Sequence, residues 1–214
     1  MNEGYIAIWI IVVASVLMAT GWRTMVTGNL SLRELMVFGT GALALYGIPI
    51  PIGSLAIGLS ALWAVLWAVT LLIQSQNGYK AVNLFTGSIL LAVVLFWIRQ
   101  MYLLDPVFII VHPQFDAALA AGLCTGLMAL RIKEQFILLV LAFAGAEAFL
   151  QLLHGTTGQV QIGGAAWWDN LLFALLCAKL SGGAVQAADR ILLRRNELKR
   201  LKSVQLSERE GHLS

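Results

Sequence analysis

The chain has 214 residues, of which 59% are hydrophobic and only 12% are charged, and its mean hydropathy is +0.83. Soluble domains carry about 25% charged residues, so this composition excludes a soluble globular protein. A membrane-spanning helix needs about 20 apolar residues, and the sequence therefore predicts an all-α, polytopic transmembrane helix bundle. The formal net charge of +3 lies mainly in residues 189–214, which we separate as a basic tail from a bundle formed by residues 1–188.

Apolar runs, taken in chain order, predict about seven spans. The first run precedes Arg23 instead of following a basic segment, so it is expected to remain as a span and not to be a secretory signal. Ser31 and Glu34 have the spacing of a capping box at the start of the second span. Pro49 and Pro51 divide the second span from the third, because proline lacks the N–H that a helix needs. The predicted spans are residues 5–21, 35–48, 53–73, 81–103, 114–130, 136–153 and 167–188, with a short interfacial or re-entrant helix within 106–111.

Basic residues gather on alternate connections between these spans. Lysine and arginine are retained on the cytoplasmic side of membrane proteins, and Arg99 is the one basic residue that falls on the opposite side. The pattern predicts an N-terminus outside and a cytoplasmic C-terminus. The predicted cytoplasmic residues are Arg23, Arg33, Lys80, Arg131, Lys133 and the basic residues of the tail.

Glu147 in the sixth span and Lys179 in the seventh are full charges inside predicted membrane segments. A rise of about 1.5 Å per residue, counted from the cytoplasmic ends, places them about 16 Å and about 13 Å deep. Side chains tilt toward the N-terminus of their own helix, so on antiparallel helices these two lean toward each other and favour an ion pair. The alternatives are that Lys179 extends to the cytoplasmic interface and that Glu147 is protonated and bonded to backbone.

Gln151 and His154 share a helical face with Glu147. In a transport protein these groups would form a proton or ion relay toward the outer surface. In a structural role the pair of Glu147 and Lys179 would fix how the sixth and seventh spans pack. The residues alone leave both interpretations open, with a structural role slightly favoured.

A second polar cluster is predicted on the exoplasmic side. Its members come from four regions that a seven-helix bundle brings to one end, and a metal or ligand site is one interpretation. The spacing of His112 and Asp116 by four residues is weak evidence for a metal ligand pair, so helix capping and ordinary solvation are favoured and no metal is predicted. The cluster comprises Arg99, Asp105, His112, Asp116, His154 and Asp169.

The tail is predicted to continue the seventh span as an amphipathic helix that bends onto the anionic lipid of the inner leaflet. We expect no nucleic-acid partner, because the basic segment is short and adjoins a membrane span. Small residues that recur at every fourth position of the fifth and seventh spans indicate close helix packing, within the bundle, in a homo-oligomer or with another membrane protein. The predicted lipid-contacting residues are Arg190, Arg194, Arg195, Lys199, Arg200 and Lys202.

Two family resemblances follow from these features. Seven spans with a lysine in the last one resemble microbial rhodopsins, but the third span, SLAIGLSALWAVLWAVTLL, has no carboxylate to serve as counter-ion. The chain also resembles the YphA-type family of small bacterial integral membrane proteins in its length, its opening EGYIAIWI, the LLDPVF stretch after the fourth span and its basic tail. That resemblance implies a multi-pass protein of the bacterial cytoplasmic membrane and carries over no activity.

The sequence indicates a class of function but no specific activity. We expect an accessory or scaffold protein of the membrane, with a small transporter or channel built around Glu147 and Lys179 as the alternative. An enzyme is not expected, because the sequence has no nucleophile with a base, no metal-ligand motif and no phosphate-binding loop. No cofactor is expected either.

Overall fold

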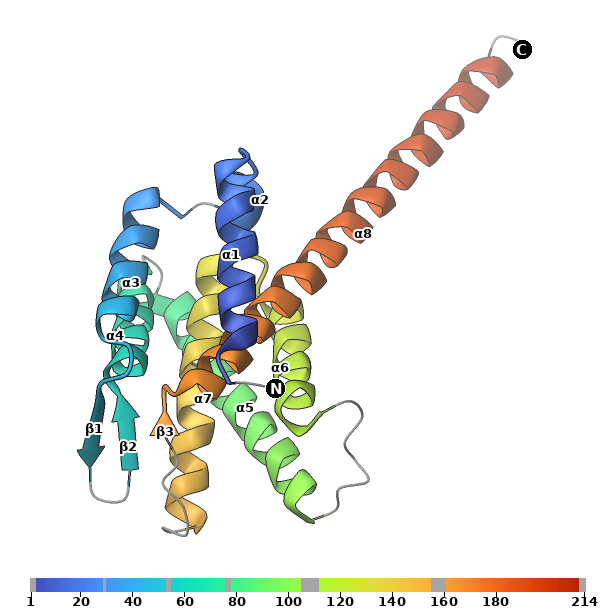
Figure 1. The fold of residues 1–214 in the computed structure, drawn as a ribbon. Coiled ribbons are helices and arrows are strands. Elements are labelled where there is room, and N and C mark those ends of the chain that lie inside the picture. The colour runs from blue at the N-terminus through green and yellow to red at the C-terminus, as the bar shows by residue number, and fades with distance from the viewer. Residues whose placement is uncertain are drawn as a thin grey trace.

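The computed structural model describes residues 3–28, 30–52, 55–75, 78–104, 112–154 and 161–211. Within these ranges the chain forms eight helices and three short strands (Figure 1). The helices are α1 (Tyr5–Ala19), α2 (Arg23–Thr27), α3 (Leu32–Ala44), α4 (Leu59–Ile73), α5 (Gly78–Leu104), α6 (Pro113–Met128), α7 (Ile132–His154) and α8 (Ala165–Gly211). The strands are β1 (Pro49–Ile52), β2 (Leu55–Gly58) and β3 (Gln161–Ile162).

Each predicted span corresponds to a helix, although most of the helices are short. In the described part of the chain, two segments are long and apolar enough to cross a membrane by length and composition, Gly78–Tyr102 in α5 and Ala165–Arg195 in α8. Helices α1, α4 and α6 contain shorter apolar segments. The short helix predicted within 106–111 lies outside the described residues.

The start of α3 confirms the predicted capping box. The Ser31 hydroxyl accepts a hydrogen bond from the Glu34 N–H at 3.2 Å, and the Glu34 carboxylate accepts one from the Ser31 N–H at 2.9 Å. These two bonds satisfy N–H groups that the first helical turn leaves without backbone partners. The sequence thus encodes this helix start locally.

A β-hairpin replaces the simple break that the prolines predicted between the second and third spans. Pro49 pairs with Gly58 and Ile52 with Leu55, so the expected helical residues 55–58 are extended instead. Proline is tolerated in an edge strand, where no N–H is required of it, and β1 is such an edge. Strand β2 lies between β1 and β3, and it pairs with β3 in parallel.

The helices of the bundle have two distinguishable ends. Helices α5 and α7 run parallel, since Lys80 pairs with Glu134 near their N-termini while Ala92 lies beside Gly145 further along. Helices α6 and α8 are also parallel, with Gly122 against Ala174. We call the end with Lys80 and Glu134 the basic end, and the end with the sheet the hairpin end.

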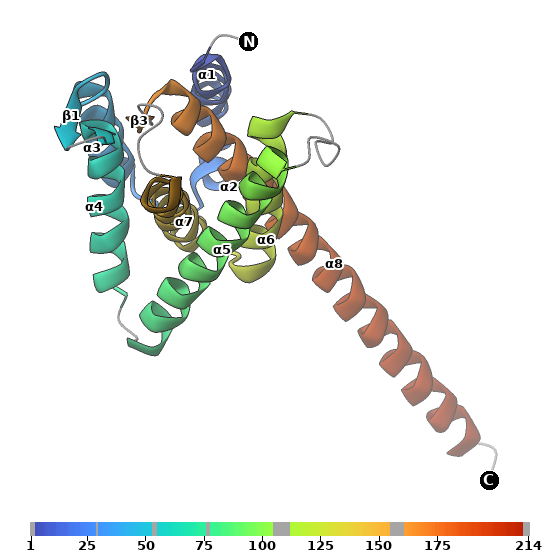
Figure 2. The same ribbon diagram turned by 90° about the horizontal axis from the view of Figure 1, so that it is seen from below.

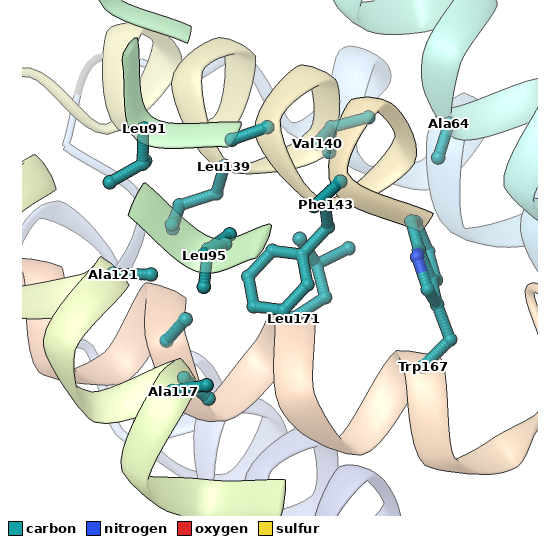
Figure 3. Packing of buried hydrophobic residues seen from close by; sticks show 14 of the residues in the cluster. Ala64, Leu91, Leu95, Ala117, Ala121, Leu139, Val140, Phe143, Trp167 and Leu171 are labelled. Carbon is teal, nitrogen blue, oxygen red and sulfur yellow. The ribbon is translucent and has the colours of Figure 1, made fainter. Parts of the chain in front are cut away.

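Small residues and large apolar side chains alternate in the core. Phe143 of α7 is fully buried, and Figure 3 shows it beside Leu95 of α5 and Leu171 of α8. Helix α4 packs on α7, with Ala64 and Ala68 buried, and its buried Ala61 lies against Gly163. The outer surface is apolar as well: in α1 only Ala7 is buried, and most of its large side chains are exposed. An apolar exterior of this extent is what lipid contact requires.

The tightest contact joins α6 to α8. A Cβ atom on Gly126 would lie 2.6 Å from the Ala178 carbonyl oxygen, and one on Gly122 would lie 2.5 Å from the Ala174 carbonyl oxygen. Only glycine lets the two backbones approach so closely, as is common where helices associate in lipid. The small residues in these spans were therefore correctly interpreted as helix contacts.

Helix α8 continues without interruption from Ala165 to Gly211. Its C-terminal part projects away from the bundle as a straight helix, on the side opposite α3 and α4 (Figures 1 and 2). The predicted continuation of the last span is confirmed, whereas the predicted bend is absent. No glycine or proline follows Gly183 within the helix until Gly211, so nothing in the sequence interrupts its hydrogen bonds there.

We predict that Gly126→Ala lowers the free energy of unfolding by about 1–3 kcal/mol, the usual cost of adding a methyl group to a packed contact. Thermal unfolding in detergent measures the change. Gly183→Ala is the matched control, because a Cβ at Gly183 meets nothing within 4 Å and alanine favours helix. Equal stability of the two variants would contradict the close α6–α8 contact.

Candidate functional site

Glu147 forms an ion pair with Arg99, which lies on α5. The predicted pair of Glu147 with Lys179 is therefore wrong. Both partners are largely buried, with side-chain exposures of 19% for Arg99 and 15% for Glu147. A charge-assisted hydrogen bond between such groups replaces the solvation that each charge loses in the bundle.

Close packing of α5 against α7 holds this ion pair in place. A Cβ on Gly145 would lie 3.4 Å from the Ala92 Cβ, so the two helices touch two residues before Glu147 on α7 and two turns before Arg99 on α5. Phe96 and Phe149 make an edge-to-face contact with ring centres 4.9 Å apart. Glu147 stands thirteen residues along α7 from Glu134, about 20 Å at 1.5 Å per residue, and so lies in the half of the bundle near the hairpin end.

Lys179 lies near the basic end, far from Glu147. The Gln135 amide donates a 3.1 Å hydrogen bond to the Ala178 carbonyl, which places this part of α8 level with the start of α7. Glu147 is twelve residues further along α7, or about 18 Å away. The depth estimate failed because it counted from Ala188, whereas Ala178 of α8 is already level with the start of α7.

The ammonium group of Lys179 lies beside the end of α2. Its Nζ atom is 3.9 Å from the position a Cβ would take on Gly28, and Gly28 is the C-cap of α2. Extension of Lys179 to the cytoplasmic interface, one of the alternatives considered from sequence, stays a prediction. Cations near helix C-termini interact favourably with the exposed carbonyl groups.

Asp169 and Arg99 of the predicted exoplasmic cluster bind partners outside that cluster. Asp169 is buried, and its carboxylate accepts hydrogen bonds from the Gly4 N–H at 2.7 Å and the Ala7 N–H at 2.6 Å. It thus caps α1, which has no side-chain cap of its own. Asp116 is also buried and accepts a hydrogen bond from the His112 N–H at 3.4 Å.

The remaining predicted positions are placed as follows. His112 is exposed and contacts the Phe115 ring. Gln151 lies one turn beyond Glu147 on α7. Asp105 and the His154 side chain lie outside the described residues. Among the described residues, no group of three or more His, Cys, Asp or Glu is placed to hold a metal ion.

A network of ion pairs ties three helices together at the basic end. Lys80 of α5 binds Glu134 of α7. Lys133, also of α7, lies 2.9 Å from the Glu34 carboxylate of α3. The hydrogen bond from Lys133, together with that from Ser31, holds the pKa of Glu34 below its ordinary value. The carboxylate therefore stays ionised and paired at neutral pH.

Gln135 is a structural residue that the sequence did not reveal. It is buried, and its amide donates hydrogen bonds to the Ala129 carbonyl at 2.9 Å and the Ala178 carbonyl at 3.1 Å. These bonds join the end of α6, the start of α7 and the first third of α8. In the sequence, Gln135 stands directly before an apolar run, and a glutamine in that position is normally assigned to a polar turn.

In the tail, Arg190, Arg194 and Arg195 are exposed on α8 together with Ile191, Leu192 and Leu193. Lys199, Arg200 and Lys202 also lie on α8, and their side chains are outside the description.

Taken together, an apolar exterior, paired charges in the interior and two long apolar helices define an integral membrane protein built as a helix bundle. Residues 3–203 match the YphA-like integral membrane proteins, and the chain belongs to this family. No curated protein and no solved structure matches the chain. The family resemblance drawn from the opening segment, the LLDPVF stretch and the tail is thereby confirmed.

We predict that Arg99→Gln and Glu147→Gln each lower the free energy of unfolding by about 3 kcal/mol, because each leaves a buried charge without its partner. The double variant should lose less than the sum of the two. Chemical denaturation in detergent measures this coupling. Glu147→Gln combined with Lys179→Met is the control, and its effects should add, since distant sites act independently. Coupling of Glu147 to Lys179 but not to Arg99 would contradict the structure.

Proposed function

We propose that the protein is an accessory or scaffold protein of the bacterial cytoplasmic membrane, not an enzyme, and that the extension of α8 is its working element. The bundle anchors this helix, and the exposed basic residues of the helix contact anionic lipid at the inner surface. Their attraction is electrostatic, with each basic residue near such a surface contributing about 1 kcal/mol.

The proposed topology has seven passes, an outside N-terminus and a cytoplasmic C-terminus. The support comes from the charge distribution of the two ends. Lys80, Arg131 and Lys133 lie at the basic end, whereas Arg99 lies toward the hairpin end and is paired. Retention of basic residues on the cytoplasmic side favours the basic end as the inner one.

The observation that carries the proposal is the continuity of α8. Residues near its start pack in the core, such as Leu171 and Ala174, and the same helix continues to Gly211 beyond the bundle. A rigid helix transmits the position of the bundle to the exposed segment around Arg194. Ile191 and Leu193, which are more than 60% exposed, add apolar surface to this basic segment.

We predict that a nitroxide label at Leu192 is more accessible to oxygen and less accessible to a water-soluble quencher when the bilayer contains anionic lipid than when it is zwitterionic. Electron paramagnetic resonance in reconstituted bilayers measures both accessibilities. Arg190→Gln, Arg194→Gln and Arg195→Gln together should abolish the difference. A label at Val37 on α3, which is also exposed, serves as control. An unchanged signal at Leu192 would refute the proposed lipid contact.

A transport role is the second candidate, and the buried pair of Arg99 and Glu147 is the observation that favours it. Intramembrane charges mark ion pathways in many transporters, and Gln151 continues the same face of α7. If the pair carries protons, Glu147→Gln abolishes proton flux into proteoliposomes under an imposed potential. An accessory protein shows no flux above empty vesicles in either form.

A further inference from the structure

A lateral groove follows one face of α4 next to the start of α3. Its volume is about 320 Å³, and it is open on one side. The α4 residues recur at helical spacing and thus form one continuous stripe. The lining residues are Trp63, Leu66, Trp67, Thr70, Leu71 and Gln74 of the α4 segment and Glu34 of α3. We call this feature the α4 groove.

The α4 groove changes from apolar to polar along its length. Trp63, Leu66 and Trp67 form the deep part, while Gln74 and Glu34 form the part at the basic end. From Trp63 to Gln74 the helix rises about 16 Å, close to the roughly 15 Å that half of a bilayer hydrocarbon core measures. The groove therefore has the length and polarity of one leaflet lipid, with its headgroup at the basic end.

The deep wall of the groove is held in a fixed geometry. The Trp63 indole donates a 3.3 Å hydrogen bond to the Phe38 carbonyl, and a Cβ on Gly41 would lie 2.6 Å from the Trp63 ring. Trp67 stacks at an angle against Trp63, with ring centres 5.9 Å apart. Gly41 thus lets Trp63 lie against α3, and the two indoles form a rigid apolar floor.

Helix α3 leaves this face open. None of its residues is buried, and besides its packing on α4 it meets α7 through the Glu34–Lys133 ion pair and an edge-to-face contact between Phe38 and Phe136. The groove therefore opens to the surroundings of the bundle, which for an integral membrane protein are lipid.

One negative group lines the polar end of the groove, and a positive group outside the lining is bonded to it. Glu34 lines it with a carboxylate that is 31% exposed, and Lys133, bonded to that carboxylate, is 36% exposed. A headgroup with an ammonium and a phosphate matches this arrangement, the ammonium toward Glu34 and the phosphate toward Lys133. A purely anionic headgroup meets the Glu34 charge unfavourably, and a quaternary ammonium has no N–H to donate to the carboxylate.

We propose that the α4 groove binds a phospholipid with a primary-amine, zwitterionic headgroup, with its ammonium group on Glu34, its phosphate on Lys133 and one acyl chain over Trp63 and Trp67. Such binding occurs within the leaflet at the basic end and is independent of the proposed role of the α8 extension.

Brominated lipids test this occupancy, because bromine on an acyl chain quenches a tryptophan that the chain touches. The full-length protein is reconstituted in bilayers in which brominated phosphatidylethanolamine, phosphatidylglycerol or phosphatidylcholine replaces the same mole fraction of unlabelled lipid. Quenching in the Trp67→Phe variant is subtracted from quenching in the unmodified protein, and the difference is the part that comes from Trp67 in the groove. Trp9→Phe is the control, since Trp9 is exposed on α1.

We expect the ethanolamine lipid to quench the Trp67 component about threefold more effectively than the other two, the ratio that one partly exposed ion pair gives. Glu34→Gln keeps the capping box, because glutamine also serves at that position, but it removes the charge and should shift the preference to the anionic lipid. Glu134→Gln removes a carboxylate at the same end outside the groove and should leave the preference unchanged.

Two results would overturn the proposal. Equal quenching of the Trp67 component by all three lipids would show that the groove holds bulk lipid without selection. An ethanolamine preference that survives Glu34→Gln would show that the headgroup does not bind there. Circular dichroism of each variant confirms that the helices are retained, so a loss of preference is not a loss of fold.

Discussion

Helices α5 and α7 lie side by side and run in the same direction. Their contact determines at which positions a charged side chain of one helix has a partner of opposite charge on the other. The hydrocarbon region offers no water to solvate an ion, so a charged group there needs a partner on a neighbouring helix. The parallel register supplies one at two levels, Lys80 with Glu134 at the basic end and Arg99 with Glu147 toward the hairpin end. Between these two levels the helices are in contact at Ala92 and Gly145.

The second parallel pair, α6 with α8, packs without ion pairs at its closest points. Its contact depends on glycines at positions where any side chain would meet backbone, and Gln135 joins it to α7 through two carbonyl groups. Ion pairs therefore stabilise the contact of α5 with α7, whereas close backbone packing stabilises the contact of α6 with α8. Polar or aromatic contacts also attach the peripheral helices: Asp169 binds the start of α1, and Glu34 and Phe38 join α3 to α7.

Local signals in the sequence were sufficient for the class of protein and for the order of the helices. Apolar runs located every helix except the short α2, which lies in a polar stretch, and the Ser31 capping box marked the start of α3. The pairing of helices was not accessible in this way, because it depends on which faces meet. The prediction assumed that consecutive spans are adjacent in space, and it therefore paired Glu147 with Lys179 of the next span. In the structure the partner is Arg99, two helices earlier.

The two prolines illustrate a different limit. They correctly indicated that a helix could not continue through residues 49–51, but a missing N–H does not distinguish a turn from an edge strand. In the structure β1 forms a hairpin with β2. Strand β2 also pairs with β3, which comes from a segment more than a hundred residues later. Likewise, the boundary of the last span was set from composition, although α8 continues as a helix well beyond it.

The parallel register of α5 and α7 is tested most directly by disulfide trapping in the intact membrane protein. The Cβ atoms at positions 92 and 145 lie about as far apart as those of a disulfide. In a chain whose free cysteines, Cys124 and Cys177, are replaced by alanine, the Ala92→Cys, Gly145→Cys pair should oxidise readily. The Glu147→Cys, Lys179→Cys pair should not. The opposite result would contradict the arrangement of helices on which this account depends.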